Sequence, residues 1–541
     1  MTVNLRLLLN KLFTTLALLS VLLIVAALIG ILAPILWRGG SAVVFKDTLE
    51  FRRLQLEQFG RGDREEIERE MHQAAEVRQR AYDLLDRFSA GLDTKDLQTK
   101  VRQVHRQVVD QLTNGDLSTS QQRPIKALSM ELRDELLEAL DTDDASQAEQ
   151  HLQNMLSHKD DPLLRQTPAQ GFTAIAEQYR SVIKRVDLKR RAEYATALGE
   201  VREELFALLG PRLGDPQPAL IEKQYGATRC DAAQQHLDRL LYAETWAEQG
   251  SGQSLAKVRI PRDEQFAGTD MAALFPLLRE QSSEMLLPHW TFYWQYFIDD
   301  NFSGHYLGGC GPEILGTLLI TVLSIVFALP LGVVAAAHLV ECAADSLFTR
   351  ILRTCINTLA GVPSIVFGLF GLAFFVIYVQ PRLGLPPGSS ILAGSLTLAL
   401  LVLPVIIRAS EEAIRSVPRA YREASLSLGA SRFRCFVGVT LPAALPGILT
   451  GLILSMSRAA GETAPILFTA GIAMGKIPQS LAQPTRTLSY GSYDMAVGDK
   501  MAALAPHNQF GMVMTLVAVV LILNIVAIVL RGRLSKRLRG L

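Results

Sequence analysis

Residues 418–442 read PRAYREASLSLGASRFRCFVGVTLP and lie between two long apolar segments. Pro418 suits the first turn of a helix, where its missing N–H costs no hydrogen bond. Tyr421, Ala424 and Leu428 then recur at the i, i+3 and i+7 positions, which gives this helix one narrow apolar face. The stretch therefore predicts a short amphipathic helix that begins near Pro418.

The end of this helix is marked as well. Gly429 favours the left-handed conformation that stops a helix, and Ser431 can cap a second helix. We therefore expect a helix, a sharp turn and a second helix that project from a membrane as a knob. Such a knob can dock by its apolar face into a groove on a soluble partner, and an ordinary amphipathic loop is the alternative.

Six apolar runs are each long enough to cross a bilayer whose hydrocarbon core is about 30 Å thick. The fifth run is longer than a span requires and contains Pro446, Gly461 and Pro465, so we expect it to be tilted or broken. The six runs lie at about 12–36, 313–340, 351–379, 389–408, 440–473 and 510–530.

Between the first two runs the chain is polar, charged and helical in its periodicity. The predicted fold class is an all-α integral membrane protein with six transmembrane helices and a large, mainly helical extracytoplasmic domain. Residues 1–37 form the cytoplasmic N-terminus and first anchor, and 38–304 form the extracytoplasmic domain. Residues 305–541 form the rest of the transmembrane domain, and a cytoplasmic loop at 409–442 carries the knob.

Basic residues set the orientation of these spans. Lysines and arginines flank the first run, crowd the loop that holds the knob and follow the last run. With six spans these three regions fall on one side, so both termini are cytoplasmic and 38–304 is periplasmic. A cleaved signal peptide is the alternative for the first run, whose apolar stretch exceeds a signal core of about 7–15 residues. The basic residues serve this orientation, and nothing in them indicates nucleic acid binding.

Other motifs give fewer functional signals. The five cysteines and nine histidines show no metal-ligand spacing, so no metal site is predicted. Cys230 and Cys310 both fall on the predicted outer side, where a disulfide is permitted, and the sequence leaves their pairing open. Eight aromatic residues crowd 290–306, which indicates either an aromatic belt at the membrane interface or a docking surface. Gly471 to Lys476 is one residue short of a phosphate-binding loop, so no nucleotide site is expected there.

Two charges fall inside the fifth run. Arg458 lies sixteen residues after Pro442, or about 24 Å along a helix, which places it deep in the bilayer. Charges at such depth face an interior or a water-filled path. The i, i+4 spacing places Arg458 and Glu462 on one helix face. The pair either lines a pathway for a tetrahedral anion or only braces the bundle.

The spacing of the knob is similar to a motif of binding-protein-dependent ABC importers, E-A-A, x3, G, x9, I-x-L-P. Here it reads Glu423-Ala424-Ser425, then Gly429, then Val439-Thr440-Leu441-Pro442, with conservative departures at Ser425 and Val439. From about residue 305 onward the chain resembles the PstA-type permease subunit of the phosphate ABC importer. Three further stretches carry this resemblance, GVPSIVFG at 361–368, LVLPVIIR at 401–408 and SRAAGETAP at 457–465.

The resemblance implies roles for particular residues. Arg458, Glu462 and Thr463 would belong to the substrate pathway, and Gly361, Pro363 and Gly368 would be points of bending or close helix packing. The residues implied in coupling to the ATPase are Tyr421, Glu423, Ala424, Ser425, Leu428, Gly429, Leu441 and Pro442.

The resemblance also implies an assembly in the bacterial inner membrane. The partners would be a PstC-type second permease, two PstB-type ATPase subunits and a periplasmic PstS-type phosphate-binding protein. ATP and Mg²⁺ would bind the partner ATPase, and this chain would bind no cofactor and perform no covalent chemistry. An importer for another oxyanion, such as sulfate or molybdate, is the nearest alternative. A membrane sensor is a second one, but it predicts a signalling domain where only residues 531–541 remain.

Overall fold

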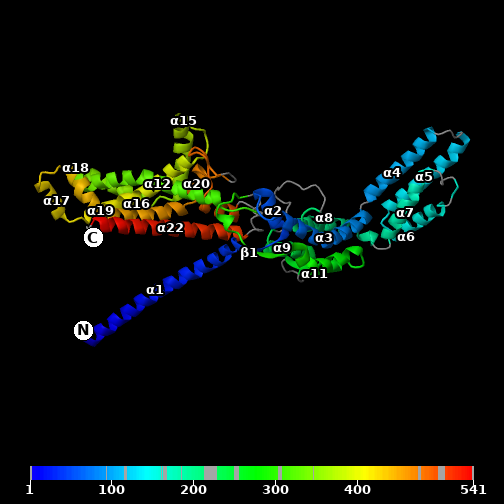
Figure 1. Cartoon of the computed structure of the whole chain (residues 1–541), viewed down its shortest axis with the longest axis horizontal. Coiled ribbons are helices and arrows are strands. Elements are labelled where there is room, and N and C mark those ends of the chain that lie inside the picture. Colours follow the sequence, from blue (N-terminus) through cyan, green and yellow to red (C-terminus); the bar gives the residue numbers. More distant parts are fainter. Residues whose placement is uncertain are drawn as a thin grey trace. The chain divides into compact units, whose positions relative to one another are not determined.

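The computed structural model describes residues 3–92, 94–114, 119–159, 161–162, 167–183, 186–212, 228–248, 255–301, 307–344, 346–472, 477–497 and 506–538 (Figure 1). The chain divides into two compact units. The membrane unit comprises Met1–Phe45 and Trp290–Leu541, and the helical unit comprises Lys46–His289.

The membrane unit is built almost entirely of helices. It begins with α1 (Val3–Gly40) and resumes after β4 (His289–Phe292) with η3 (Trp294–Phe297). The helices that follow are α12 (Gly311–Ala337), η5 (His338–Cys342), α13 (Leu347–Leu359), α14 (Ser364–Gly371), η6 (Leu372–Val379), α15 (Gln380–Arg382), α16 (Ile391–Arg415), α17 (Arg419–Ser427), α18 (Arg432–Cys435), η7 (Phe436–Thr440), α19 (Leu441–Gly461), α20 (Ala464–Thr469), α21 (Leu488–Val497) and α22 (Pro506–Leu538).

Within these described residues, six helical stretches are long and apolar enough to cross a membrane, which confirms the predicted number of spans. They are Lys11–Gly40, Gly311–Cys342, Ser364–Arg382, Ile391–Arg415, Arg432–Gly461 and His507–Arg537.

The predicted start of the third span at residue 351 is wrong. Residues 347–359 form a separate helix, α13, and the chain turns at Gly361 before Pro363 begins α14. A proline removes a backbone donor and disfavours helical geometry at the residue before it, which favours a helix break at this position. The apolar run hid this break because α13 is itself amphipathic and leaves Leu347, Phe348 and Ile351 exposed.

The fifth span also differs from its predicted bounds of 440–473. It begins earlier, at Arg432, and its helix ends at Gly461. Glu462 is extended, with φ −73° and ψ 130°, and the short helix α20 follows with Pro465 in its first turn. The expected break is therefore present, and it lies directly after the Arg458 turn.

Small residues let the helices of the membrane unit approach one another closely. A Cβ at Gly451 would lie 2.2 Å from the Cβ of Ala409, so α19 packs directly on α16. Likewise, a Cβ at Gly368 would lie 3.0 Å from the Cα of Pro465, so α14 packs on α20. The first helix, α1, exposes its apolar side chains along most of its length, and near its end Arg38 lies over the ring of Phe510 on α22.

The described residues of the helical unit form two large hydrophobic cores and a small cluster of Leu49, Ile67 and Ala74. One large core is formed by α3 (Arg64–Leu92), α8 (Arg191–Leu209), α9 (Cys230–Leu241) and α11 (Leu274–Leu286), and the other by α4 (Thr94–Asn114), α5 (Thr119–Asp141), α6 (Ala145–Ser157) and α7 (Gln170–Ile183). The remaining elements are β1 (Val44–Asp47), α2 (Leu49–Phe59), η1 (Leu188–Arg190), β2 (Tyr242–Glu248), β3 (Leu255–Pro261), α10 (Arg262–Gln265) and η2 (Asp270–Ala273).

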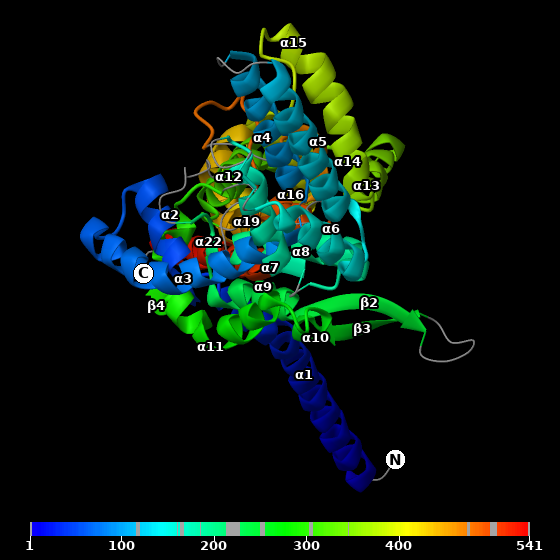
Figure 2. The same ribbon diagram turned by 90° about the vertical axis from the view of Figure 1, so that its right-hand side faces the viewer.

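Strands are a minor part of the fold. β2 and β3 pair antiparallel from Tyr242 opposite Pro261 to Glu248 opposite Leu255, and this hairpin extends away from the neighbouring helices (Figure 2). β1 pairs with β4 in a second two-stranded sheet.

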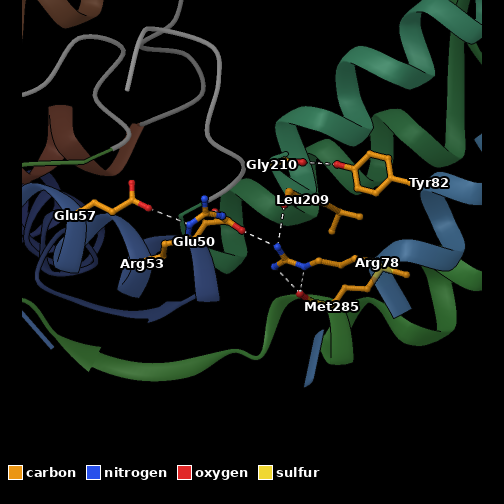
Figure 3. A network of polar contacts seen from close by, with 8 residues as sticks. All are labelled: Glu50, Arg53, Glu57, Arg78, Tyr82, Leu209, Gly210 and Met285. Carbon is orange, nitrogen blue, oxygen red and sulfur yellow. Dashed lines mark hydrogen bonds and ion pairs between the residues drawn. The ribbon is translucent and has the colours of Figure 1, made fainter. Parts of the chain in front are cut away.

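Arg78 joins three elements of the helical unit (Figure 3). Its Nη1 lies 2.7 Å from the Oε1 of Glu50 and donates to the carbonyl of Leu209 at 2.9 Å. Its Nε and Nη2 donate to the carbonyl of Met285 at 2.9 and 2.7 Å. Glu50 is completely buried and also pairs with Arg53 at 3.4 Å. A single guanidinium thus satisfies a buried carboxylate and the C-terminal ends of α8 and α11.

Candidate functional site

The stretch at 418–442 forms the predicted knob, α17 followed by α18. Pro418 is the N-cap of α17, with φ −55° and ψ 135°, one position before the first turn expected for it. Gly429 has φ +84°, a conformation that glycine adopts without strain, and it ends the first helix. The hydroxyl of Ser431 accepts a hydrogen bond from the backbone N–H of Arg434 and caps α18. The predicted helix, turn and second helix are therefore confirmed.

The apolar face of this knob is uncovered. Tyr421 is 57% exposed and Leu428 is 90% exposed, and no residue of α17 is buried. Phe433, on α18, is 75% exposed and is a further exposed apolar side chain of the knob. Sequence reasoning missed Phe433 because the periodicity of α17 ends before it. An apolar surface on a short projecting helix is typical of a docking site for a partner.

Arg422 fixes α17 to the bundle. Its Nη1 lies 3.2 Å from the Oε1 of Glu341, and its Nη2 donates to the carbonyl of Ile414 at 2.5 Å. Its own carbonyl accepts a weak hydrogen bond from the thiol of Cys435 at 3.7 Å. These contacts connect α17 to α18 within the knob and to α16 and η5 of the bundle.

The predicted coupling residues do not all share one environment. Glu423 and Ala424 are exposed on α17, and Ser425 is half-buried. Leu441 and Pro442 begin α19 instead and are half-buried, with Leu441 against a core cluster of α12, α16 and α19. The residues on α17 therefore belong to the knob, whereas Leu441 and Pro442 connect the knob to the fifth span.

The predicted pathway pair lies at the other end of α19. The Nε of Arg458 is 3.4 Å from the Oε1 of Glu462, and the two side chains are 42% and 16% exposed. Arg458 occupies the last turn of α19, and Glu462 and Thr463 form the break before α20. The structure thus brings together the three predicted pathway residues at an interruption of a membrane helix.

The predicted points of bending or close helix packing are Gly361, Pro363 and Gly368, and the last of these lies against this break. Pro363 begins α14, and Gly368 meets α20 at Pro465, two residues after Thr463. Gly368 is therefore a packing glycine, while Gly361 forms the turn that ends α13. The Gly368 contact joins the third span to the helix that follows the pathway pair.

Sequence reasoning missed a second charged pair in the membrane unit. The Nε of Arg486 lies 3.1 Å from the Oε1 of Glu313, and the two side chains are 2% and 0% exposed. The Nη2 of Arg486 also lies 3.7 Å from the Oδ2 of Asp494. A glutamate two residues into an apolar span was the available signal, but its partner is remote in sequence.

Other expectations concern residues outside these sites. All five cysteines are free thiols, so Cys230 and Cys310 form no disulfide. The aromatic cluster divides, with Trp290, Phe292 and Trp294 more than half exposed and Tyr293 and Tyr296 buried. Its members Phe302 and Tyr306 lie outside the described residues.

The helical unit also contains one small group of possible metal ligands that the sequence did not indicate. The Nδ1 of His151 lies 2.6 Å from Glu135 and 3.7 Å from Glu138. The three side chains are partly exposed and already paired with one another, which is an ordinary surface ion pair.

This architecture and the projecting knob define a membrane subunit that works with a soluble partner. Residues 328–540 match the family described as "Binding-protein-dependent transport system inner membrane component". The phosphate transport system permease protein PstA 1 of Mycobacterium tuberculosis H37Rv is 32% identical over 247 residues, which are 46% of this chain and 77% of that protein. The chain belongs to this family of importer permeases, whose members are transport subunits of the inner membrane that work with an ATPase and a binding protein.

Other relatives share shorter regions. The probable ABC transporter permease protein YqgI of Bacillus subtilis is 37% identical over 194 residues, 34% of this chain and 64% of that protein. The phosphate transport system permease protein PstA of Xylella fastidiosa strain 9a5c is 37% identical over 163 residues, 30% of this chain and 55% of that protein. The inward-facing structure of the MetNI methionine ABC transporter covers 42% of this chain and 94% of its own, at 20% identity and a TM-score of 0.33.

Proposed function

We propose that the chain is the permease subunit of an ATP-driven importer for inorganic phosphate. The exposed knob of α17 and α18 supports the coupling half of this proposal, because none of the described residues covers its apolar face. The phosphate half rests on relatives named as phosphate transport permeases and on the Arg458–Glu462 pair at the helix break.

The pair has the chemistry that phosphate selection requires. A guanidinium donates two parallel hydrogen bonds to the oxygens of a tetrahedral anion. Phosphate carries at least one proton at neutral pH and donates it in a hydrogen bond to the Glu462 carboxylate. Sulfate has no such proton, so the same carboxylate repels it. Arg458 would attract the anion, and Glu462 would discriminate between anions.

The assembly would contain a PstC-type second permease, two PstB-type ATPase subunits and a PstS-type binding protein. ATP and Mg²⁺ would bind the ATPase subunits, and this chain would bind no cofactor. Closure of the ATPases would move the knob, and Arg422 would pass that motion to α16 and η5. Both termini would be cytoplasmic, and residues 38–304 would be periplasmic.

The test is uptake of labelled phosphate by cells that lack their own high-affinity system and carry this chain with its partners. We expect Arg458→Ala to abolish uptake, while the ATPase still copurifies with the chain. Arg531→Ala, near the end of α22, is the matched control and is expected to retain uptake. Labelled sulfate is tested in parallel. Sulfate uptake, or uptake that is independent of Arg458, would contradict the proposed substrate or pathway.

A further inference from the structure

Residues 483–491, here called the polar segment, enter the interior of the membrane unit. Six consecutive residues, 485–490, are each no more than 7% exposed. Four of them are polar or charged, Thr485, Arg486, Thr487 and Ser489. Buried polar groups are costly unless they are bonded, so the contacts of this segment show what it holds in place.

The polar segment contacts α12. Arg486 pairs with Glu313 at 3.1 Å, and the backbone N–H of Leu488 donates to the hydroxyl of Thr317 at 2.9 Å. Gly316 lies between the two acceptors, and a Cβ there would lie 1.9 Å from the carbonyl oxygen of Arg486. The segment therefore lies directly on the helix backbone and is fixed to α12 by a buried ion pair.

The polar segment also contacts the break between α19 and α20. The hydroxyl of Ser489 donates to the carbonyl of Glu462 at 2.9 Å. The N–H of Thr485 donates to the carbonyl of Ala470 at 3.0 Å. These two acceptors flank α20, so the polar segment holds the backbone on both sides of this helix.

We propose that Arg486, held by Glu313, is a positioning residue that acts through Ser489 to fix Glu462 for phosphate passage. The reasoning rests on the proposed function, in which Glu462 meets the anion. The Ser489 hydroxyl fixes the carbonyl of Glu462, and this bond sets the direction of its side chain toward Arg458. Arg486 fixes Ser489, since the buried pair with Glu313 keeps the segment from sliding along α12.

The opposing view is that the polar segment only stabilises the bundle. The two views differ in one measurable quantity, the amount of phosphate moved for each ATP hydrolysed. A smaller fraction of folded importer lowers transport and ATP hydrolysis together and leaves their ratio unchanged. A misplaced Glu462 lowers transport in importers that are assembled and hydrolyse ATP, so the ratio falls.

The experiment uses the complete importer in proteoliposomes with saturating phosphate-loaded binding protein. We expect Ser489→Ala to lower phosphate transported per ATP by about three- to tenfold, the range of one hydrogen bond. Ser410→Ala is the matched control, because the buried hydroxyl of Ser410 has no hydrogen-bond partner among the described residues. An unchanged ratio in Ser489→Ala would overturn the proposal.

Arg486 is tested in a form that still folds. The double variant Glu313→Leu with Arg486→Met removes both buried charges, a replacement that proteins often tolerate. We expect it to assemble and to show the same lowered ratio, whereas a wild-type ratio would remove Arg486 from the proposal. Arg458→Ala, measured alongside, separates the two claims. If Arg458→Ala transports normally, the proposed pathway fails, and if it alone is inactive, only the positioning role fails.

Discussion

The contacts of Arg78 predict a large stability effect in the helical unit (Figure 3). In Arg78→Met, Glu50 remains fully buried and keeps only the 3.4 Å pair with Arg53. The carbonyls of Leu209 and Met285 lose three hydrogen bonds in the same substitution. Removing one partner of a buried ion pair costs about 3–5 kcal/mol, because the remaining charge is left uncompensated.

Hydrogen exchange measured by mass spectrometry on the full chain in nanodiscs reports this loss locally. A cost of about 3–5 kcal/mol corresponds to roughly 10²- to 10⁴-fold faster exchange at the slowest amides of α8 and α11. Arg80→Met is the matched control on the same helix. Arg80 pairs with Glu76, and the two side chains are 57% and 76% exposed, so we expect a change of less than about 0.5 kcal/mol.

A second variant tests the cause of the effect. Glu50→Leu combined with Arg78→Met removes the stranded charge as well as its partner, so exchange is expected to slow again toward the wild-type rate. Exchange in Arg78→Met within about threefold of the wild type would refute the reasoning. It would show that Arg53 alone compensates Glu50 and that Arg78 is not the joint between α2, α8 and α11.

Three further predictions concern other sites. Leu428→Asp on the exposed knob is expected to leave the melting temperature unchanged and to weaken ATPase copurification by about 30-fold or more, as for a hot-spot residue. Leu383, which is 63% exposed and lies outside the knob, is the control, and Leu383→Asp is expected to retain the ATPase. Gly451→Ala is expected to destabilise the membrane unit by about 1–3 kcal/mol, because the new Cβ would lie 2.2 Å from the Cβ of Ala409. Gly438 has open space around it, so Gly438→Ala is expected to leave stability unchanged. Equal melting temperatures of the two variants would contradict this reasoning. Burial raises the pKa of the Cys230 thiol, so less thiolate is present at a given pH than in the unfolded chain. We therefore expect alkylation of Cys230 in the folded protein to require a higher pH than in the unfolded chain. Labelling that requires a reductant would instead indicate a disulfide.

The knob was predictable because its determinants are local. Pro418, Gly429 and Ser431 act within a few residues of their own positions, and the chain forms the helix, turn and helix that they specify. The number of spans was predictable for a similar reason, since hydropathy needs no tertiary information. The third span shows where hydropathy stops being sufficient. The apolar run continues through α13, so only the backbone restriction at Pro363 reveals the boundary.

The polar segment could not be predicted from the sequence in the same way. Arg486 follows Pro484 and Thr485 in a stretch with the composition of an exposed loop, and Glu313 begins an apolar helix far away in the chain. Each charge taken alone resembles a residue at a membrane surface. The tertiary fold brings the two charges together and buries both side chains almost completely. Neither residue indicates an interior site when only the sequence is read.

Glycines of the third and fifth spans also have roles that depend on tertiary contacts and cannot be read from the sequence alone. The sequence leaves open whether Gly368 is a hinge or a packing position, because either role needs only a missing side chain. In the structure both glycines lie at close helix contacts, since a Cβ at Gly368 would lie 3.0 Å from the Cα of Pro465 and one at Gly451 would lie 2.2 Å from the Cβ of Ala409. Consequently α20 packs against α14, and the residues on either side of it, Glu462 and Ala470, are bonded to the polar segment. The break that carries the Arg458–Glu462 pair is therefore tied to both elements, so we expect a shift of the Glu462 backbone to move α14 or the polar segment with it.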